Sequence, residues 1–130
     1  KTPQYLHFGW AAARLDDLVN LPASRLTALL FILASLFSGK DRAIKAARVT
    51  WRDARRHRSP NAGWPEAAMA GALNMKFGGP RTYGGEFVKL PYMGDGRDHF
   101  LRQDIDAGLR LFDHSMWIML AFTLLFTLVF

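Results

Sequence analysis

The 130-residue sequence lacks several features that carry common protein chemistries. It has no cysteine, which excludes disulfide-stapled folds, thiol catalysis and cysteine-based zinc or iron–sulfur sites. No two of its histidines stand at a zinc-binding spacing, and neither GK[ST] nor GxGxxG occurs. Charged residues make up only 22% of the chain and apolar residues 50%, so a disordered polar chain is excluded as well.

Two apolar runs are the most prominent features that are present. Residues 26–37 and 116–130 carry no charge, and we extend them to predicted membrane segments at 21–38 and 115–130, with Arg25 reaching toward the interface. A helix crosses a bilayer with about 17 to 25 residues, so both segments are short. Before the first segment, residues 5–20 have helical spacing, and we expect that helix to end near Pro22. The predicted fold is therefore a mainly α-helical, polytopic membrane protein.

Three further regions lie between the two apolar segments. Residues 40–58 predict a basic amphipathic helix, residues 59–96 form a glycine- and proline-rich cytoplasmic region, and residues 98–113 predict a second amphipathic helix. Within the middle region, residues 65–74 read as a short helix with small residues at close-packing positions. Residues 86–92 predict a short strand, which Pro91 restricts to a sheet edge.

The positive charge is confined to one stretch. The whole formal net charge of +6 is contained in residues 40–58, which hold eight lysines and arginines against Asp41 and Asp53. Such charge alone would fit nucleic acid, but the flanking apolar segments argue against that partner. The lysine and arginine bias instead predicts that this stretch lies on the cytoplasmic side of a membrane.

The end of this stretch is a candidate anion site. Arginine donates hydrogen bonds in a fixed planar fork, and hydroxyl, amide and backbone N–H groups extend such a site. Alternatively, these cations complement a helix dipole and face anionic lipid. The candidate phosphate-binding residues are Arg55, Arg56, Arg58, Ser59 and Asn61, beside His57, whose arginine neighbours favour its neutral form.

Other candidates are carboxylates and glycines. Asp16 and Asp17 stand near a predicted helix end, where a magnesium ion shared with nucleotide phosphates would offset the unfavourable dipole. The alternative is exposure or an ion pair of Asp17 with Arg14. Glu66 is a candidate general base, or simply a stabilising acid in the first turn of a helix. The last candidates are two glycine pairs that either cradle phosphate or form turns: Gly78, Gly79, Gly84 and Gly85.

Three stretches of the sequence resemble one known family. They are YLHFGWAAARLDDLVNLPASRLTALL at 5–30, DARRHRSPNAGWPEAAMAGALN at 53–74 and GGPRTYGGE at 78–86. The family is CobD/CbiB, the adenosylcobinamide-phosphate synthases of cobalamin biosynthesis, and the middle stretch is its most specific signature here. The resemblance covers essentially the whole chain as the family's C-terminal portion. We therefore expect one region that belongs to a longer protein and is inactive alone.

The resemblance implies an ATP-dependent ligation. A carboxylate of adenosylcobyric acid would be joined to aminopropanol or its phosphate, with ATP and Mg²⁺ as substrate and activator and no tightly bound cofactor. The implied partners are the corrinoid, the amine, the lipid bilayer and other membrane-bound enzymes of the nucleotide-loop pathway, with no nucleic acid. Within this reaction we assign the arginine-rich turn to phosphates, Asp16 and Asp17 to magnesium, and Glu66 to proton removal.

A second interpretation comes from another class of protein. The wider group that resembles this family includes a regulatory membrane protein of β-lactamase induction, so a noncatalytic membrane sensor or scaffold is the alternative. The polar turn from Arg58 to Asn61, together with the glycine pairs, favours the enzyme, because a sensor has no need of both.

Overall fold

The computed structural model describes residues 6–130, which form four α-helices, two short 3₁₀ turns and four short strands. The prediction of a mainly helical chain is confirmed. In chain order the elements are α1 (Leu6–Ala34), η2 (Ser35–Ser38), α2 (Lys40–Asp53), η3 (Ala54–Arg56), α3 (Gly63–Leu73), β1 (Phe77–Gly78), β2 (Arg81–Tyr83), β3 (Glu86–Val88), β4 (Tyr92–Met93) and α4 (Arg102–Val129).

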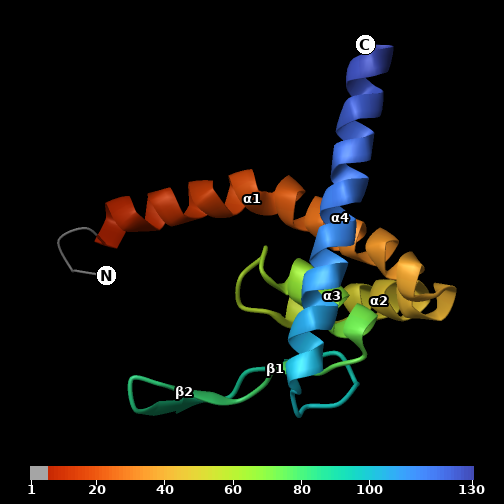
Figure 1. Ribbon diagram of the computed structural model, residues 1–130. Coiled ribbons are helices and arrows are strands. Elements are labelled where there is room, and N and C mark those ends of the chain that lie inside the picture. Colours follow the sequence, from red (N-terminus) through yellow and green to blue (C-terminus); the bar gives the residue numbers. More distant parts are fainter. Residues whose placement is uncertain (1–5) are drawn as a thin grey trace.

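Helix α1 contradicts the prediction that a helix ends near Pro22. Pro22 lies inside a single helix that continues to Ala34, and Figure 1 shows α1 as one bent ribbon. A proline inside a helix removes one backbone hydrogen bond and bends the axis, but packing on both sides of it can keep the helix continuous. Here Ser24, Ala28 and Phe31, which follow the proline, are all buried in the described structure.

Small residues bring α2 and α3 close together. Ala46, Ala67 and Ala68 have no exposed surface. A Cβ added to Gly71 would lie 2.6 Å from Cα of Ala46, so the two helices touch at their backbones. The close packing predicted for the small residues of the short helix is confirmed, and α1 lies over this pair.

The strands form two small antiparallel pairs. Strand β1 pairs with β4, aligning Phe77 with Met93, while β2 pairs with β3, aligning Tyr83 with Glu86. The single strand predicted at 86–92 is therefore wrong: it is divided into β3 and β4, with Pro91 between them. Proline cannot donate to a strand ladder, and this explains the division.

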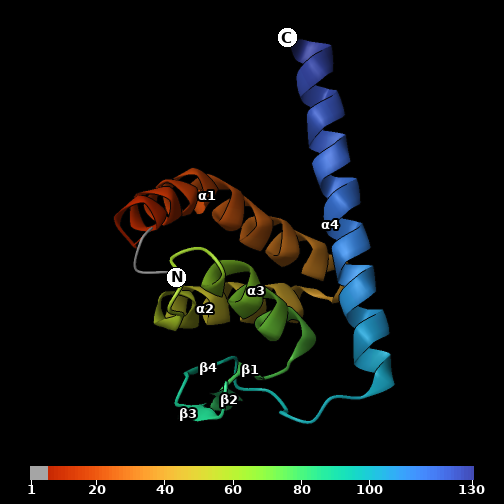
Figure 2. The same cartoon turned by 90° about the vertical axis from the view of Figure 1, so that its left-hand side faces the viewer.

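Helix α4 joins the second amphipathic segment to the last apolar run. It begins at Arg102, and the N–H of the preceding Leu101 donates to Oδ2 of Asp104 at 2.7 Å. Two helices are long and apolar enough to cross a membrane, spanning Gly9–Ser38 and Arg102–Val129. A third of the apolar window of the first is buried in the molecule, against 6% for the second. Figures 1 and 2 show α1 running across α4 rather than beside it.

Candidate functional site

The turn that follows α2 folds back on itself. Oγ of Ser59 accepts from the N–H groups of Asn61 and Ala62, both at 3.3 Å, and Nδ1 of His57 accepts from the N–H of Ser59 at 2.9 Å. At Gly63 the chain passes so close to η3 that an added Cβ would lie 2.1 Å from the carbonyl oxygen of Ala54. Glycine is therefore required where the turn enters α3.

Asn61 fastens this turn to α1. Its Nδ2 donates to the carbonyl oxygen of Asp17 at 2.8 Å, and its Oδ1 accepts from Oγ of Ser24 at 3.2 Å and Nη1 of Arg25 at 3.1 Å. The amide of Asn61, predicted to bind phosphate, thus has protein partners on both sides. Its observed effect is to hold Arg25 beside the turn.

Four arginines line one open cleft between α1 and this turn. Its volume is about 650 Å³. Arg25 stacks over Trp64 with 4.8 Å between its guanidinium carbon and the ring centroid, which holds the guanidinium in place. We call this space the arginine cleft; its lining residues are Arg14, Arg25, Ala54, Arg55, His57, Arg58, Ser59, Pro60 and Trp64.

None of these four arginines forms an ion pair with a carboxylate among residues 6–130. In particular, the alternative pairing of Arg14 with Asp17 is absent from the described structure; Arg14 instead lies 5.5 Å from the centroid of Trp10. A guanidinium group that has no carboxylate partner can donate hydrogen bonds to an external anion. The arginine cleft therefore has the chemistry of an anion site.

Only some of the residues that line the arginine cleft were predicted from the sequence. Arg55, Arg58, His57 and Ser59 were predicted and do line the cleft. Arg14 and Arg25 come from α1 and were not predicted as site residues. A signal existed for Arg25, because an isolated charge beside an apolar run often marks a functional position.

Arg56 points to a different place. Its Nη1 pairs with Oδ1 of Asp53 at 3.0 Å, and it lines neither the arginine cleft nor the second cavity described below. Asp53 is completely buried and also accepts from Nε of Arg52 at 2.8 Å and from the N–H of Gly94 at 2.9 Å. We call Arg52, Asp53, Arg56 and Gly94 the Asp53 clamp.

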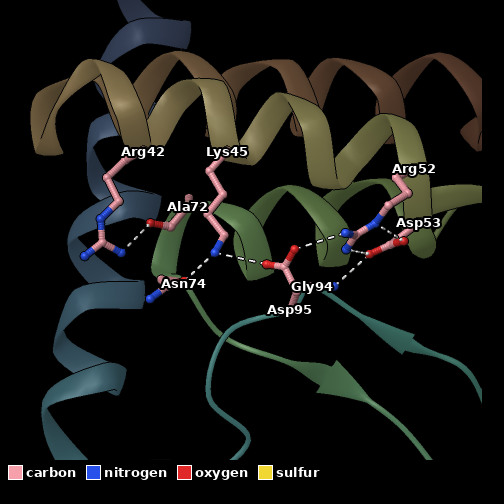
Figure 3. A network of polar contacts seen from close by, with 8 residues as sticks. All are labelled: Arg42, Lys45, Arg52, Asp53, Ala72, Asn74, Gly94 and Asp95. Carbon is pink, nitrogen blue, oxygen red and sulfur yellow. Dashed lines mark hydrogen bonds and ion pairs between the residues drawn. The ribbon is translucent and has the colours of Figure 1, made fainter.

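The clamp ties α2 to the loop after β4. Figure 3 shows cationic side chains reaching from α2 toward this loop and the end of α3. Lys45 and Arg52 each contact a carboxylate oxygen of Asp95 at 3.0 Å, and Nζ of Lys45 also donates to Oδ1 of Asn74 at 2.6 Å. Much of the predicted basic face is therefore used inside the molecule.

Opposing effects act on the pKa of Asp53. Burial alone would raise this pKa, but hydrogen bonds from Arg52 and from the N–H of Gly94 outweigh burial, and the net pKa lies below its ordinary value. The hydrogen bonds from Lys45 and Arg52 likewise lower the pKa of Asp95. Asp53, counted in the sequence only as a charge, is thus an ionised structural residue.

A second cavity of about 330 Å³ adjoins the arginine cleft. His57 and Arg58 line both spaces, and Glu66 faces the second, which we call the hairpin cavity. Because Nδ1 of His57 accepts a backbone hydrogen bond, the neutral ring carries its proton on Nε2, which lies 4.0 Å from Oε1 of Glu66. The structure thus brings the two predicted catalytic residues together. The remaining lining residues are Gly78, Arg81, Val88, Leu90, Pro91 and Met93.

The glycine pairs have different surroundings. Gly78 lines the hairpin cavity, whereas Gly79 passes beneath Tyr92, whose ring an added Cβ would meet at 2.2 Å. Gly84 and Gly85 form the two-residue turn between β2 and β3, with φ of 56° and 87°. Positive φ at both positions is what such a hairpin turn requires, so the turn alternative accounts for this exposed pair.

The two aspartates of α1 do not form a chelating pair. Successive side chains on a helix diverge by about 100°, and Oδ1 of Asp16 already accepts from Asn20 at 3.1 Å. Among the described residues, no group of three histidine or acidic side chains could hold a metal ion. Magnesium needs only one or two protein carboxylates when substrate phosphates complete its coordination shell. A single aspartate of α1 could therefore bind Mg²⁺ only together with such phosphates.

Among its described residues, the chain is a helical protein with two apolar helices long enough to cross a membrane and a cleft lined by four arginines. The family model described as "CobD/Cbib protein" matches residues 1–112, and the chain belongs to the CobD/CbiB family. No solved structure matches it.

Several relatives are each named "Cobalamin biosynthesis protein CobD". The chain is 50% identical to the one from Sinorhizobium sp over 99% of its own length and 41% of the relative. It is 54% identical to that of Rhizobium meliloti over 86% of the chain and 35% of the relative. It is 47% identical to that of Rhodobacter capsulatus over 89% of the chain and 35% of the relative. The chain thus spans well under half the length of these curated relatives.

Proposed function

We propose that this chain is part of an adenosylcobinamide-phosphate synthase, which joins a carboxylate of adenosylcobyric acid to aminopropanol or its phosphate at the expense of ATP. The names of the family's relatives support a role in cobalamin biosynthesis. The observation that carries the assignment of the site is the arginine cleft, whose four arginines have no carboxylate partner in the described part of the chain. They suit the phosphate groups of a nucleotide and of an acyl phosphate.

The chemistry explains why such a site is needed. A carboxylate is a poor electrophile, so its oxygen first attacks the γ-phosphorus of ATP, forming an acyl phosphate and releasing ADP. The amine nitrogen then attacks the acyl carbon, the C–N bond forms, phosphate leaves with the C–O bonding electrons, and the nitrogen loses a proton. Arginines aimed at the phosphoryl oxygens stabilise the charge that develops in both steps.

In the proposal, Glu66 accepts the proton of the attacking amine. Its carboxylate lies in the hairpin cavity, next to the arginine cleft and facing Nε2 of His57. In this proposal His57 acts as a positioning residue for the carboxylate, as well as a second proton carrier. Both residues are within reach of a substrate that extends from one space into the other.

ATP and Mg²⁺ enter the proposal as substrate and activator. Magnesium would neutralise phosphate charge, with Asp16 or Asp17 as its single protein ligand. The proposed partners are the corrinoid, the amine, the lipid bilayer and other membrane-bound enzymes of the nucleotide-loop pathway. We place the protein in the bacterial inner membrane as a multi-pass protein with the basic α2 at the cytoplasmic face, where ATP is available. The membrane-sensor alternative gains no support, because the relatives are named for biosynthesis.

Replacing Arg58 tests this proposal. In the full-length protein we expect Arg58→Ala to lower ATP-dependent amide formation about 100- to 1,000-fold, because a donor to developing charge is lost. Arg48→Ala is the matched control, since Arg48 is exposed on α2 and lines neither cavity. Membrane yield and unfolding should be unchanged in both variants.

Glu66→Gln tests the proton acceptor in the same assay. It keeps the shape of the side chain but removes its basicity, so turnover should fall and the acid limb of the pH–rate profile should disappear. Normal turnover by both Arg58→Ala and Glu66→Gln would refute the site assignment. Ligation by the 130-residue chain alone would contradict the expectation that it needs the rest of the protein.

A further inference from the structure

The face of α1 that points away from α2 and α3 is apolar along its length. Following the spacing of three and four residues from position 15, the stripe holds only leucine and proline as far as Leu36 in η2. Its leucines at 15, 18, 26, 29 and 36 are each at least half exposed, whereas Leu33 is partly buried. The opposite face, with Ala28 and Phe31, is buried against the other helices. Apart from Leu33, near the crossing with α4, the leucines of this apolar stripe are exposed in the described part of the chain.

The edge of the stripe is cationic. Arg14 and Arg25 leave α1 on the side of the arginine cleft, and Trp10 lies beside Arg14. A helix with an apolar face flanked by arginine and tryptophan is the usual form of a helix that lies in the interface of a bilayer. The composition of α1 therefore fits lipid on one side and the polar cleft on the other.

Helix α4 locates that interface in the structure. Its last acidic residue is Asp113, and no charged side chain follows within its apolar end. The end of α1 meets α4 at this transition: Phe31, Ala34 and Leu111 share one buried cluster, and the rings of Phe37 and His114 are 4.7 Å apart. If the end of α4 lies in the hydrocarbon, α1 is at the level where α4 enters it.

The direction of α1 then follows from the two views. Figures 1 and 2 both show α1 running across α4 and above α2 and α3, with the C-terminal part of α4 rising on the side of α1 that faces away from α2 and α3. A helix of 29 residues that stood upright would extend about 43 Å along the bilayer normal. Lying across α4, it spans little of that depth.

We propose that α1 does not cross the bilayer but lies along its interface, with the leucine stripe in lipid and the arginine cleft directly beneath the membrane surface. α1 then lies between the lipid and the arginine cleft, and Arg14 and Arg25 extend from α1 toward the cleft. This inference is independent of the reaction proposed above, because it rests on the apolar stripe and on the crossing of α1 over α4.

Paired spin labels test the orientation. The chain has no cysteine, so single cysteines can be placed in the full-length protein, with any others replaced by serine, in nanodiscs containing anionic lipid. Leu18→Cys and Leu29→Cys lie on the same face, about 16 Å apart along the axis. We expect dissolved oxygen to reach both labels. We also expect their depths in the bilayer to agree within about 5 Å, because an interfacial helix lies parallel to the membrane surface.

Trp117→Cys and Leu128→Cys are the matched control, because they have the same eleven-residue spacing on α4 and both native side chains are exposed. Their depths should differ by about 16 Å if α4 crosses the bilayer. A similar difference for the α1 pair would overturn the proposal, and so would equal depths for the α4 pair. Labels on α1 that reach neither oxygen nor a polar nickel chelate would show that protein covers the stripe, which also overturns it.

Discussion

Two groups of arginines lie within a few residues of each other in this chain but have different surroundings. Arg52 and Arg56 are held by the buried carboxylate of Asp53, whereas Arg55 and Arg58 line a cleft without a carboxylate partner in the described structure. The first group ties α2 to a loop, and the second is available to an external anion. Local density of positive charge therefore does not distinguish a cation that is paired inside the molecule from one that has no carboxylate partner there.

After Arg58, the next largest expected effect comes from Arg25, a cleft residue that was not predicted from the sequence. Arg25→Ala should reduce ATP-dependent turnover about a hundredfold, since a fixed guanidinium is removed from the phosphate site. Arg25→Lys should recover only part of it, because an ammonium lacks the planar fork. If turnover per folded molecule is unchanged while the unfolding midpoint drops, Arg25 belongs with the structural arginines instead.

On the structural side, Asp53→Asn should lower the free energy of unfolding by about 2–3 kcal/mol in detergent. The amide cannot accept all the hydrogen bonds from Arg52, Arg56 and Gly94, and two cations lose their counter-charge. Denaturant unfolding followed by circular dichroism measures the loss. Lost ATP-dependent turnover with unchanged stability would instead move Asp53 into the functional site.

The same carboxylate makes stability depend on pH. The pKa of Asp53 is lower in the folded chain than in the unfolded one, so its contribution is complete above an unfolded-state pKa of about 4. As the pH falls further, the unfolded state binds the proton first, and stability declines until the pH passes the folded pKa. Unfolding midpoints at pH 6, 4 and 3 should show this decline, reduced in Asp53→Asn; an equal slope in both proteins would contradict it.

The smallest effect is expected at the rim of the clamp. Asp95 pairs with Lys45 and Arg52, but its side chain is half exposed. Asp95→Ala should therefore cost less than about 1 kcal/mol, because exposed ion pairs contribute little and salt screens them. The same unfolding experiment in low and high salt measures it. A loss of stability as large as that of Asp53→Asn would mean that the difference in burial does not explain how much Asp53 and Asp95 each contribute to stability.

Local sequence pattern predicted much of the helical fold. The basic helix, the short small-residue helix and the two apolar runs all correspond to helices, because each depends on spacing within about ten residues. Pro22 was misjudged, since packing after the proline keeps α1 continuous. The strand at 86–92 was misplaced because its pairing depends on partners elsewhere in the chain.

The site was predicted from one segment only. The turn at 55–59 supplies half of the arginines of the cleft, but the other half come from α1. The contact that joins them, from Asn61 to the carbonyl of Asp17, links residues 44 positions apart. Spacing along the chain carries no record of such a contact, so the sequence did not show that Arg14 and Arg25 lie beside this turn.

The sequence by itself determined the family, the helical class, the apolar runs and the stretch that holds the net charge, because composition and short periodicities decide these. Only the folded chain shows what each arginine contacts. Arg55 and Arg56 are neighbours, yet one enters the cleft and the other pairs with Asp53. Adjacent side chains leave a helical turn in different directions, and only the folded chain determines whether a carboxylate or an open cleft lies there.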